Sequence, residues 1–541
     1  MKKKLTKIIC FLLAALMCLG IAAGCNNKPS DPAATKEPGK TTDQDPDPTE
    51  EPDDGKMKIT LKDDQNSEKV ITDKKIDTPS SFKDNGGKFT ISAIYGNHMV
   101  LQANMNVRIF GKHTGSDEYV GAELTKKDSK ETRYFYGKVE NGEFEIWLGT
   151  TNYGGPYTLT IFDKDGNSVK FDDVLFGEVY VLGGQSNMGW ALGQCYVEKK
   201  GKLLYQDLIN STNNDNVRYM GMWPKQSQEY VEYVSSTTGW QSATSSTVPG
   251  WSAVGYFFAM RMNEIYGIPV GVVSSCMGGT GIDRWYTEEK TGDWYRGTTH
   301  PIRKMTFRGV CWYQGEGDFS KYSDRLTKLI GQWRTAFENP NLYWAAVEMP
   351  RYQNADAYYQ CREEVKKLYG VVDKYTYCVT LDTGLFPEFA AEGDELNTDG
   401  IHPYDKQKVG QRLADACAQD FYGAEGTWKS PYAVSAEVKD GKVLVTFENV
   451  GDGMTVVGLL KGFEVAGTDR KYKDATPEVV GKNQILLTCD EVTTIWGVRY
   501  GRKNYRGDGI TSASDSACCY NTVNGEAAYP LEQFVLSKLN G

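Results

Sequence analysis

The stretch VYVLGGQSNMG, residues 179–189, combines a short apolar run with two glycines and a serine, Ser186. Its β-branched and aromatic residues predict a buried strand, and Gly183 and Gly184 predict a tight turn that brings the backbone close to whatever Ser186 faces. A nucleophilic serine is presented in this way, although glycine, serine and asparagine after a strand are also ordinary turn residues. The residues that follow the other predicted strands therefore decide between a catalytic and a structural Ser186.

Predicted strands and helices alternate over residues 177–428. After the opening strand, further strands are expected at 270–275, 309–313, 342–347 and 375–381, and helices at 254–265, 322–337, 358–369 and 406–421. This alternation predicts an α/β domain, in which helices cover both faces of a parallel sheet. In such a sheet the ligand site lies beyond the carboxyl ends of the strands.

Two regions without helical periodicity flank this domain. Residues 86–176 alternate short strand-like runs with turns, which predicts a small antiparallel β-sandwich. Residues 429–541 again contain strand-like runs, and the pair Asp440 and Gly441 predicts a hairpin turn. We therefore expect the α/β domain to lie between an N-terminal and a C-terminal β-sandwich-like domain.

Residues 1–24 have the features of a secretory signal. A lysine-rich start precedes an apolar run over residues 8–19 and small residues before Cys25. The apolar run is shorter than the roughly 20 residues that a membrane-spanning helix needs. The sequence Ala-Ala-Gly-Cys at 22–25 resembles the bacterial lipobox, which implies cleavage before Cys25 and lipidation of its sulfur. The alternative is ordinary cleavage after the small residues.

Residues 25–85 are poor in apolar side chains and rich in proline, threonine and acidic residues over most of their length. Such a composition cannot bury enough surface to offset the entropy of ordering, so we expect a disordered acidic tether. Together, the signal and the tether predict a secreted protein on the extracytoplasmic face of a bacterial cell membrane. Its contact with the membrane is expected only through the lipid anchor.

Charge and cysteine content narrow the class of protein. The net charge is −10 at pH 7 and basic clusters are absent after the tether, which argues against a nucleic-acid partner. Cys276 and Cys311 fall in apolar strand-like runs and are expected to be buried thiols. Cys518 and Cys519 are adjacent, and the sequence leaves their pairing open. Because no metal-ligand spacing occurs, we expect no metal and no other cofactor.

Chemically useful residues follow four of the predicted strands. Ser186 follows the first strand, and a glycine-rich loop containing Gly279 follows the second. Gln314 follows the third, and Asp399 stands three residues before His402 in the segment that precedes the last helix. Ester hydrolysis by a serine needs a base, an acid that orients this base, and donors for the oxyanion. The strand ends supply a candidate for each role, although an Asp-x-x-His segment also suits a helix cap beside a solvated imidazole.

The chain contains four histidines, which compete for the role of base. His402 is the one that belongs to an Asp-x-x-His arrangement beyond a predicted strand end. His98 and His113 fall in the first β domain, where structural or surface roles are expected. His300 lies within the α/β region and is the competing candidate.

Four motifs at these strand ends resemble conserved blocks of one family. They are GQSNM at 184–188, GGTGIDRW at 278–285, WYQGE at 312–316 and DGIHP at 399–403. In this order they resemble the sialate O-acetylesterase-like branch of the SGNH hydrolases. The resemblance extends to MVLQ at 99–102 and WSAVGYFFA at 251–259, and it covers most of the chain from about residue 88. It implies an SGNH-type three-layer α/β/α domain.

The resemblance also implies an activity and a set of site residues. The expected enzyme is an esterase that removes acetyl groups from carbohydrate hydroxyls through an acetyl-enzyme, with Ser186 as nucleophile, His402 as base and Asp399 as its orienting acid. The amides of Ser186 and Gly279 and the side chain of Gln314 would form the oxyanion hole. Residues that would contact substrate or support the site are Gln185, Asn187, Glu316, Asp283, Arg284, Trp285 and Trp312. Gly281, Ile282 and Asp283 depart from the Pro-Ile-Glu usual in the family, which leaves specificity open.

Two alternatives to a carbohydrate esterase remain open at the level of sequence. A lipid or short-chain ester hydrolase would use the same chemistry, but the α/β region shows no long apolar segment for a lid or an acyl tunnel. A lipoprotein that binds glycans without cleaving them would also suit the tether and the aromatic residues near the motifs. These aromatic residues, which either stack on sugars or pack in the core, are Trp190, Trp251, Trp285, Tyr286, Trp294, Tyr295, Trp312 and Tyr313.

Overall fold

The computed structural model describes residues 56–59, 76–197, 202–288, 290–352, 355–384, 401–403, 405–504 and 518–539. The expected signal peptide, Cys25 and Asp399 lie outside these residues. Within the expected tether, the amide of Met57 donates to the carbonyl of Ile265 at 3.0 Å, so this part of it contacts the folded body. No helix in the described part of the chain is both long enough and apolar enough to cross a membrane.

A mixed sheet with helices forms the centre of the α/β region and confirms the predicted α/β class. The parallel strands follow the order β11, β13, β8, β14, β15 and β16, and β12 pairs antiparallel with β11 at the edge. The strands are β8 (Ser168–Gly184), β11 (Asn213–Met222), β12 (Thr237–Thr244), β13 (Val270–Cys276), β14 (Gly309–Tyr313), β15 (Tyr343–Val347) and β16 (Tyr375–Cys378). Every residue of β14 and β15 is buried, as expected for strands covered on both faces.

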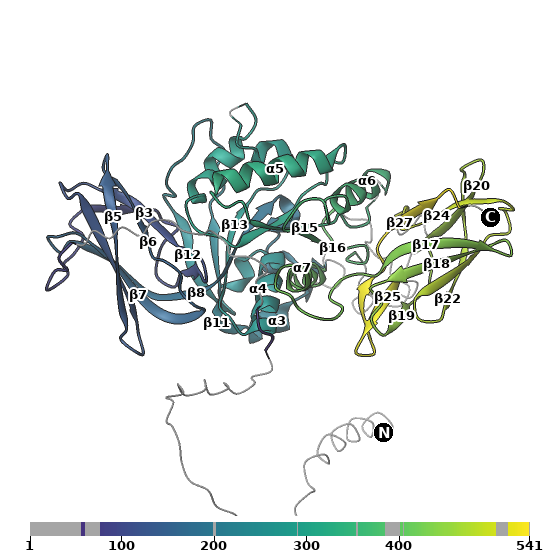
Figure 1. Cartoon of the computed structure of the whole chain (residues 1–541), viewed down its shortest axis with the longest axis horizontal. Helices are drawn as coiled ribbons and strands as arrows, with labels where there is room; N and C mark the ends of the chain where they lie inside the picture. The colour runs from purple at the N-terminus through teal and green to yellow at the C-terminus, as the bar shows by residue number, and fades with distance from the viewer. Residues whose placement is uncertain are drawn as a thin grey trace, which may run out of the picture. The chain divides into compact units, whose positions relative to one another are not determined.

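Helices cover both faces of this sheet (Figure 1), with α4 and α7 on one side and α5 and α6 on the other. They are α4 (Ala253–Tyr266), α5 (Tyr322–Ala336), α6 (Ala355–Lys366) and α7 (Lys406–Phe421), with the short α3 (Gln206–Ser211) near the edge. α4 begins where Ser252 Oγ accepts from the Gly255 amide, and it ends at Gly267, whose φ of 66° suits glycine. Asp405 caps α7 by accepting from the Lys408 amide at 3.1 Å.

Two strands, β11 and β12, depart from the predicted alternation of strand and helix. The first residues of β11, NNDN, are polar and mainly exposed, and the buried part of the strand begins at Val217. β12 is an antiparallel edge strand in which Trp240 and Ala243 are the buried positions. Because only half of each strand is covered, neither contains the continuous apolar run that identifies the other strands of this sheet.

Mainly antiparallel strands build the N-terminal β region. They are β1 (Phe89–Ile91), β2 (Val100–Gln102), β3 (Arg108–His113), β4 (Tyr119–Lys126), β5 (Thr132–Glu140), β6 (Glu143–Trp147) and β7 (Gly154–Phe162). The first half of β8 pairs antiparallel with β7, and its second half pairs parallel with β13 and β14. The two regions therefore share one strand that crosses the boundary expected at residue 176.

Strands also make up the C-terminal β region. They are β17 (Tyr432–Lys439), β18 (Lys442–Glu448), β19 (Gly453–Val457), β20 (Phe463–Gly467), β21 (Tyr472–Asp474), β22 (Thr476–Val480), β23 (Gln484–Thr488), β24 (Ile495–Tyr500), β25 (Cys518–Val523), β26 (Glu526–Pro530) and β27 (Phe534–Ser537). β17 and β18 form the predicted hairpin. Asp440 has a φ of 51° and Gly441 a φ of 73°, and positive values at both central residues are typical of a type I′ turn.

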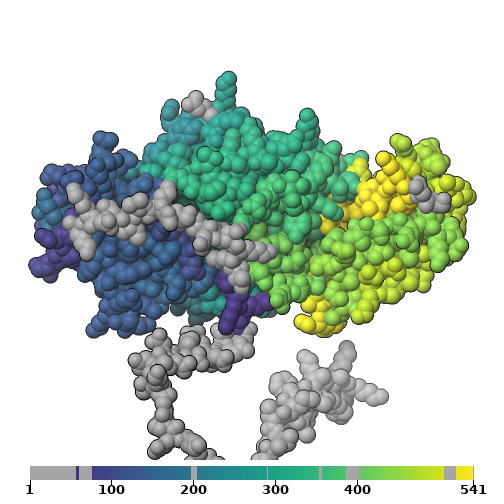
Figure 2. Space-filling view, viewed as in Figure 1, coloured from purple at the N-terminus to yellow at the C-terminus, as the bar shows by residue number. Residues whose placement is uncertain are grey.

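The C-terminal strands pack against the α/β region, and Figure 2 shows their atoms in direct contact with those of its last elements. The hydroxyl of Tyr529 donates to Asp415 of α7 at 2.9 Å, and the hydroxyl of Tyr520 donates to Asp382 at 2.8 Å. Cys276, Cys311 and Cys519 are buried free thiols, as predicted for the first two.

A buried carboxylate on β8 joins the N-terminal strands to the α/β region. Glu178 is fully buried and accepts from Arg308 Nε at 2.7 Å and from Arg308 Nη2 at 3.0 Å. The hydroxyl groups of Tyr153 and Tyr422 donate to the same carboxylate at 2.6 and 2.8 Å. Gln102 Nε2 also donates to it at 3.2 Å, so Glu178 has partners from four separate segments of the chain.

Replacing Arg308 by methionine should strongly destabilise the fold. The substitution leaves Glu178 buried without its cation, which costs about 3–5 kcal/mol of the free energy of unfolding. Denaturant unfolding followed by fluorescence measures this loss. The control is Lys112→Met, which removes an exposed ion pair with Glu143 and should leave the midpoint unchanged. Equal midpoints for Arg308→Met and wild type would contradict the structural role of the pair.

Candidate active site

A close approach of two strands fixes the turn that carries Ser186. Gly184 ends β8 with a φ of 125°, and a Cβ at this position would lie 2.1 Å from the carbonyl oxygen of Tyr313 in β14. Only glycine fits there. The next amide, of Gln185, donates to the same carbonyl at 3.1 Å, and the chain then turns into the short helix α2 (Ser186–Gly189). Ser186 is thereby presented at the carboxyl edge of the sheet.

His402 lies beside this serine. Its Nε2 is 2.8 Å from Ser186 Oγ, although the two residues are 216 positions apart in the sequence. The indole ring of Trp190 stacks on the imidazole with a centroid distance of 4.4 Å and an interplanar angle of 27°. The structure therefore brings together the expected nucleophile and base, and Trp190 is the one tryptophan of the predicted aromatic group that contacts the base.

The electrostatic surroundings favour a neutral His402. Burial and then the ammonium group of Lys406 lower the pKa of His402 from its ordinary value near 6.5. Burial also lowers the pKa of Lys406 to about 8. The lowered pKa favours the neutral imidazole, which is the form that takes the proton of a serine hydroxyl.

Asn187 clamps the nucleophile loop to the loop that carries the base. Its Nδ2 donates to the carbonyl of Ile401, next to His402, at 3.0 Å and to Glu316 Oε1 at 2.7 Å. Lys406 Nζ donates to Asn187 Oδ1 at 2.5 Å from the first turn of α7. One amide side chain thus ties the neighbours of Ser186 and His402 together, and a buried cation and a buried carboxylate hold that amide.

Glu316 is almost fully buried beneath the same loop. It accepts hydrogen bonds from the side chains of Gln185 and Asn187 and from the amide of Gly315. Burial raises its pKa, and these donors oppose the increase. Gln185, Asn187 and Glu316 were predicted to contact substrate or support the site, and in the structure they form a support beneath Ser186.

The backbone amides of Ser186 and Gly279 are two of the donors expected for an oxyanion hole. Gly278 lies so close that a Cβ there would be 3.4 Å from Ser186 Cβ, and Gly279 follows with a φ of 71°. Within the described part of the chain, neither the Gly279 amide nor the Ser186 amide has a hydrogen-bond partner. Free amides beside a serine hydroxyl suit an oxyanion site.

Gln314 already uses its side-chain amide within the protein. Its Nε2 donates to Asp318 Oδ2 at 2.6 Å and, more weakly, to the carbonyl of Thr280 at 3.4 Å. Its Oε1 accepts from the hydroxyl of Tyr322 at 2.7 Å, which in turn accepts from Trp312 Nε1 at 3.0 Å. An oxyanion that receives a hydrogen bond from Gln314 must therefore replace one of these acceptors, and the carbonyl of Thr280 is the weaker one.

Most aromatic residues of the motif loops belong to the core. Trp285 and Trp312, expected among the site residues, are 0% and 1% exposed and cannot reach a substrate. Trp285 instead donates from Nε1 to Thr280 Oγ1 at 3.0 Å and so supports the glycine loop. Residues with the same buried environment are Trp251, Tyr286, Tyr295 and Tyr313. Asp283 and Arg284 are partly exposed, and Arg284 binds Asp293.

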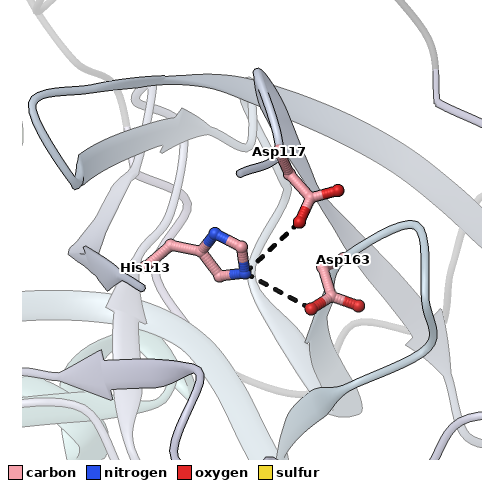
Figure 3. A group of neighbouring side chains, drawn as sticks. All are labelled: His113, Asp117 and Asp163. Atoms are coloured by element: carbon pink, nitrogen blue, oxygen red, sulfur yellow. Dashed lines mark hydrogen bonds and ion pairs between the residues drawn. The ribbon is translucent and has the colours of Figure 1, made fainter. Parts of the chain in front are cut away.

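The other three histidines lie beside carboxylates and not beside Ser186. His300 Nε2 lies 3.0 Å from Glu232, and His98 Nδ1 lies 2.6 Å from Asp173. His113 forms the one group in the described residues with metal-ligand geometry, with Nε2 pointing between Asp117 and Asp163 at 3.8 and 3.3 Å (Figure 3). Lys164 pairs with Asp117 at 3.3 Å, so an ammonium group already accompanies one of these carboxylates.

The chain is similar in sequence and in fold to known carbohydrate esterases. Residues 176–419 match the family model described as carbohydrate esterase, sialic acid-specific acetylesterase. A sialate O-acetylesterase of Pongo abelii is 24% identical over 418 residues, which span 67% of this chain and 77% of the relative. The human sialate O-acetylesterase is 24% identical over 359 residues, 57% of this chain and 66% of its own. A crystal structure of a carbohydrate acetylesterase from Xanthomonas citri matches with a TM-score of 0.69 and 24% identity, over 83% of this chain and 99% of that one.

Lys406→Met should lower the hydrolysis of an aryl acetate and change its pH dependence. Loss of the bond to Asn187 loosens the clamp, and a small displacement of reacting groups costs about 10- to 100-fold in kcat. Loss of the cation also raises the pKa of His402, so the acidic limb of kcat/KM should move to higher pH. A pH–rate profile of both proteins measures the shift.

The matched control is Lys408→Met, which removes the same charge from the same helix turn. Lys408 pairs with Asp405 and Asp382 and makes no bond to Asn187. It should shift the acidic limb less than Lys406→Met does. Identical profiles for the two variants would show that Lys406 has no special effect on the base.

Proposed function

Because residues 176–419 belong to the sialic acid-specific acetylesterase family of carbohydrate esterases, we propose that this chain is a serine esterase that removes O-acetyl groups from carbohydrates. Membership of this family makes the chain a carboxylic ester hydrolase. The observation that carries the serine mechanism is the distance of 2.8 Å between Ser186 Oγ and His402 Nε2. It supports direct proton transfer between the two groups.

In the proposed reaction, Ser186 Oγ attacks the carbonyl carbon of the acetyl group while His402 Nε2 takes the hydroxyl proton. The tetrahedral intermediate then collapses, the bond between the acetyl carbon and the sugar oxygen breaks, and His402 returns the proton to that oxygen. Water next attacks the acetyl-enzyme with His402 again as base, which releases acetate and restores Ser186. Asp399, outside the described residues, is proposed to orient the second ring nitrogen of His402.

The negative charge that develops on the acetyl oxygen needs donors. The free amides of Ser186 and Gly279 are proposed as two of them, and Gln314 as the third. Gln314 can contribute when its hydrogen bond to Thr280 is exchanged for one to the oxyanion, while Asp318 keeps the amide in place. This exchange makes the third donor stronger in the transition state than in the free enzyme, which is the condition for catalysis rather than binding alone.

An acetylated glycan is the proposed substrate, and the names of the similar proteins support this choice. The residues around Ser186 also favour it over a lipid ester, since Asp283 and Arg284 are charged and partly exposed near the glycine loop. A glycan-binding lipoprotein without activity would have no need for a neutral histidine on a serine hydroxyl.

Acetate release should depend on both members of the catalytic pair. Ser186→Ala and His402→Ala should each lower it by at least about 10³-fold on acetylated glycans, and Gln314→Ala by roughly 10²-fold. Initial rates measured with a coupled acetate assay check this expectation. The control is His300→Ala, whose rate should stay close to that of wild type. Undiminished activity of Ser186→Ala on every acetylated substrate would contradict the assignment of Ser186 as the nucleophile.

We further propose that the protein is secreted and anchored to the membrane through lipid on Cys25. Labelled fatty acid should be incorporated into the wild-type chain in a bacterial host. The protein should be found in the membrane fraction. Cys25→Ala should lose the label and appear in the soluble fraction. Equal labelling of both proteins would contradict the anchor without affecting the proposed activity.

A further inference from the structure

Trp223 differs from all other tryptophans of this chain. Its side chain is 62% exposed, and it is the only one of the twelve tryptophans, all of which lie in described segments, that is mainly exposed. In the described part of the chain its indole makes no hydrogen bond, ring contact or cation–π contact. A large apolar ring without any partner is thus offered to the solvent.

Strand register places Trp223 on the edge that carries Ser186. In the parallel ladder Gly221 of β11 pairs with Ser274 of β13, and Ser274 pairs with Leu182 of β8. Two residues farther along, Trp223 is level with Gly184, the last residue of β8. Neighbouring strands lie about 4.8 Å apart, so the backbone of Trp223 is roughly 10 Å to the side of the turn that presents the nucleophile.

The segment that follows Trp223 is held rigidly. The amide of Lys225 donates to Thr298 Oγ1 at 2.9 Å, and the Thr298 hydroxyl donates back to the Lys225 carbonyl at 3.0 Å. Thr298 is fully buried, and its neighbour Thr299 bonds to Ser275 of β13 at 3.1 Å. Trp223 is therefore a ring on a fixed backbone and not the tip of a loose loop.

A polar rim connects this ring with the glycine loop. Gln226 Nε2 donates to Asp293 Oδ2 at 2.6 Å, and Arg284 Nε donates to Asp293 Oδ1 at 3.0 Å. Arg284 belongs to the loop that begins at Gly278, against Ser186. Gln226, three residues after Trp223, is exposed, and Arg284 and Asp293 are partly exposed, so polar side chains link the Trp223 segment to the glycine loop.

We propose that Trp223 forms a stacking subsite for a second sugar unit of an acetylated oligosaccharide or polysaccharide whose acetyl group is bound at Ser186. The inference rests on the proposed function and adds the size of the substrate to it. A sugar ring has an apolar face of C–H groups that covers an indole, and hydroxyl groups at its edge that need polar partners such as Gln226 and Arg284. A lipid chain has no hydroxyl groups that could bind these side chains.

Kinetics on substrates of different length test the subsite. Trp223→Ala should keep the wild-type kcat/KM on p-nitrophenyl acetate and lower kcat/KM on chemically acetylated xylo- and manno-oligosaccharides by about tenfold. Trp223→Phe should restore most of this loss. The matched control is Val371→Ala, which truncates the most exposed large apolar residue of the described segments, at 79%, near the amino end of β16. It should change kcat/KM on neither substrate.

Fluorescence provides a readout that does not depend on turnover. Adding the acetylated oligosaccharides to Ser186→Ala should quench or shift the tryptophan emission, and the response should disappear in Ser186→Ala with Trp223→Phe. An unchanged ratio between long and short substrates in Trp223→Ala would overturn the subsite while leaving the esterase intact. A wild-type protein that cleaves no acetylated sugar would instead overturn the proposed function and the subsite together.

Discussion

The hydrogen bond between His402 Nε2 and Ser186 Oγ joins two loops that are 216 residues apart, and most of the α/β region serves to hold its two ends. One end depends on the close contact of Gly184 with the Tyr313 carbonyl, which leaves no room for a side chain. The other end depends on α7, which begins just after His402. Asn187 then ties the two loops to each other. A misplaced strand or helix would therefore separate the pair.

This arrangement places charged groups where burial opposes them. Lys406 and Glu316 lie on either side of Asn187, and burial lowers the pKa of the first and raises the pKa of the second. Such groups stabilise the fold little, because the loss of hydration offsets their attraction. Their value lies in geometry and in the electric field at the base, since Lys406 adds to the effect of burial in lowering the pKa of His402. Trp223 is likewise positioned before substrate binds. Its ring is exposed, and hydrogen bonds to Thr298 fix the backbone that follows it.

Much of the α/β fold follows from the sequence. The limits of β14 and α7 agree with the apolar runs and periodicity, because continuous burial on both faces leaves a strong pattern. β11 and β12 have a weaker apolar pattern, because only half of each strand is covered. The proximity of Ser186 and His402 could be predicted because both belong to motifs expected at the carboxyl edge of the sheet. The roles of Trp285 and Trp312 could not, since an indole in a motif loop has the same sequence signal whether it packs inward or faces solvent. Trp223 stands outside the motif blocks, and only the structure shows its surroundings and those of Lys406.

Covalent trapping tests the central claim most directly. The wild-type protein is treated with a reactive organophosphonate, and the modified peptide is identified by mass spectrometry. The account predicts a single adduct on Ser186, formed with an acidic limb that reports the lowered pKa of His402 and abolished in His402→Ala. An unmodified Ser186 in a protein that still releases acetate, or an adduct on another residue, would contradict it.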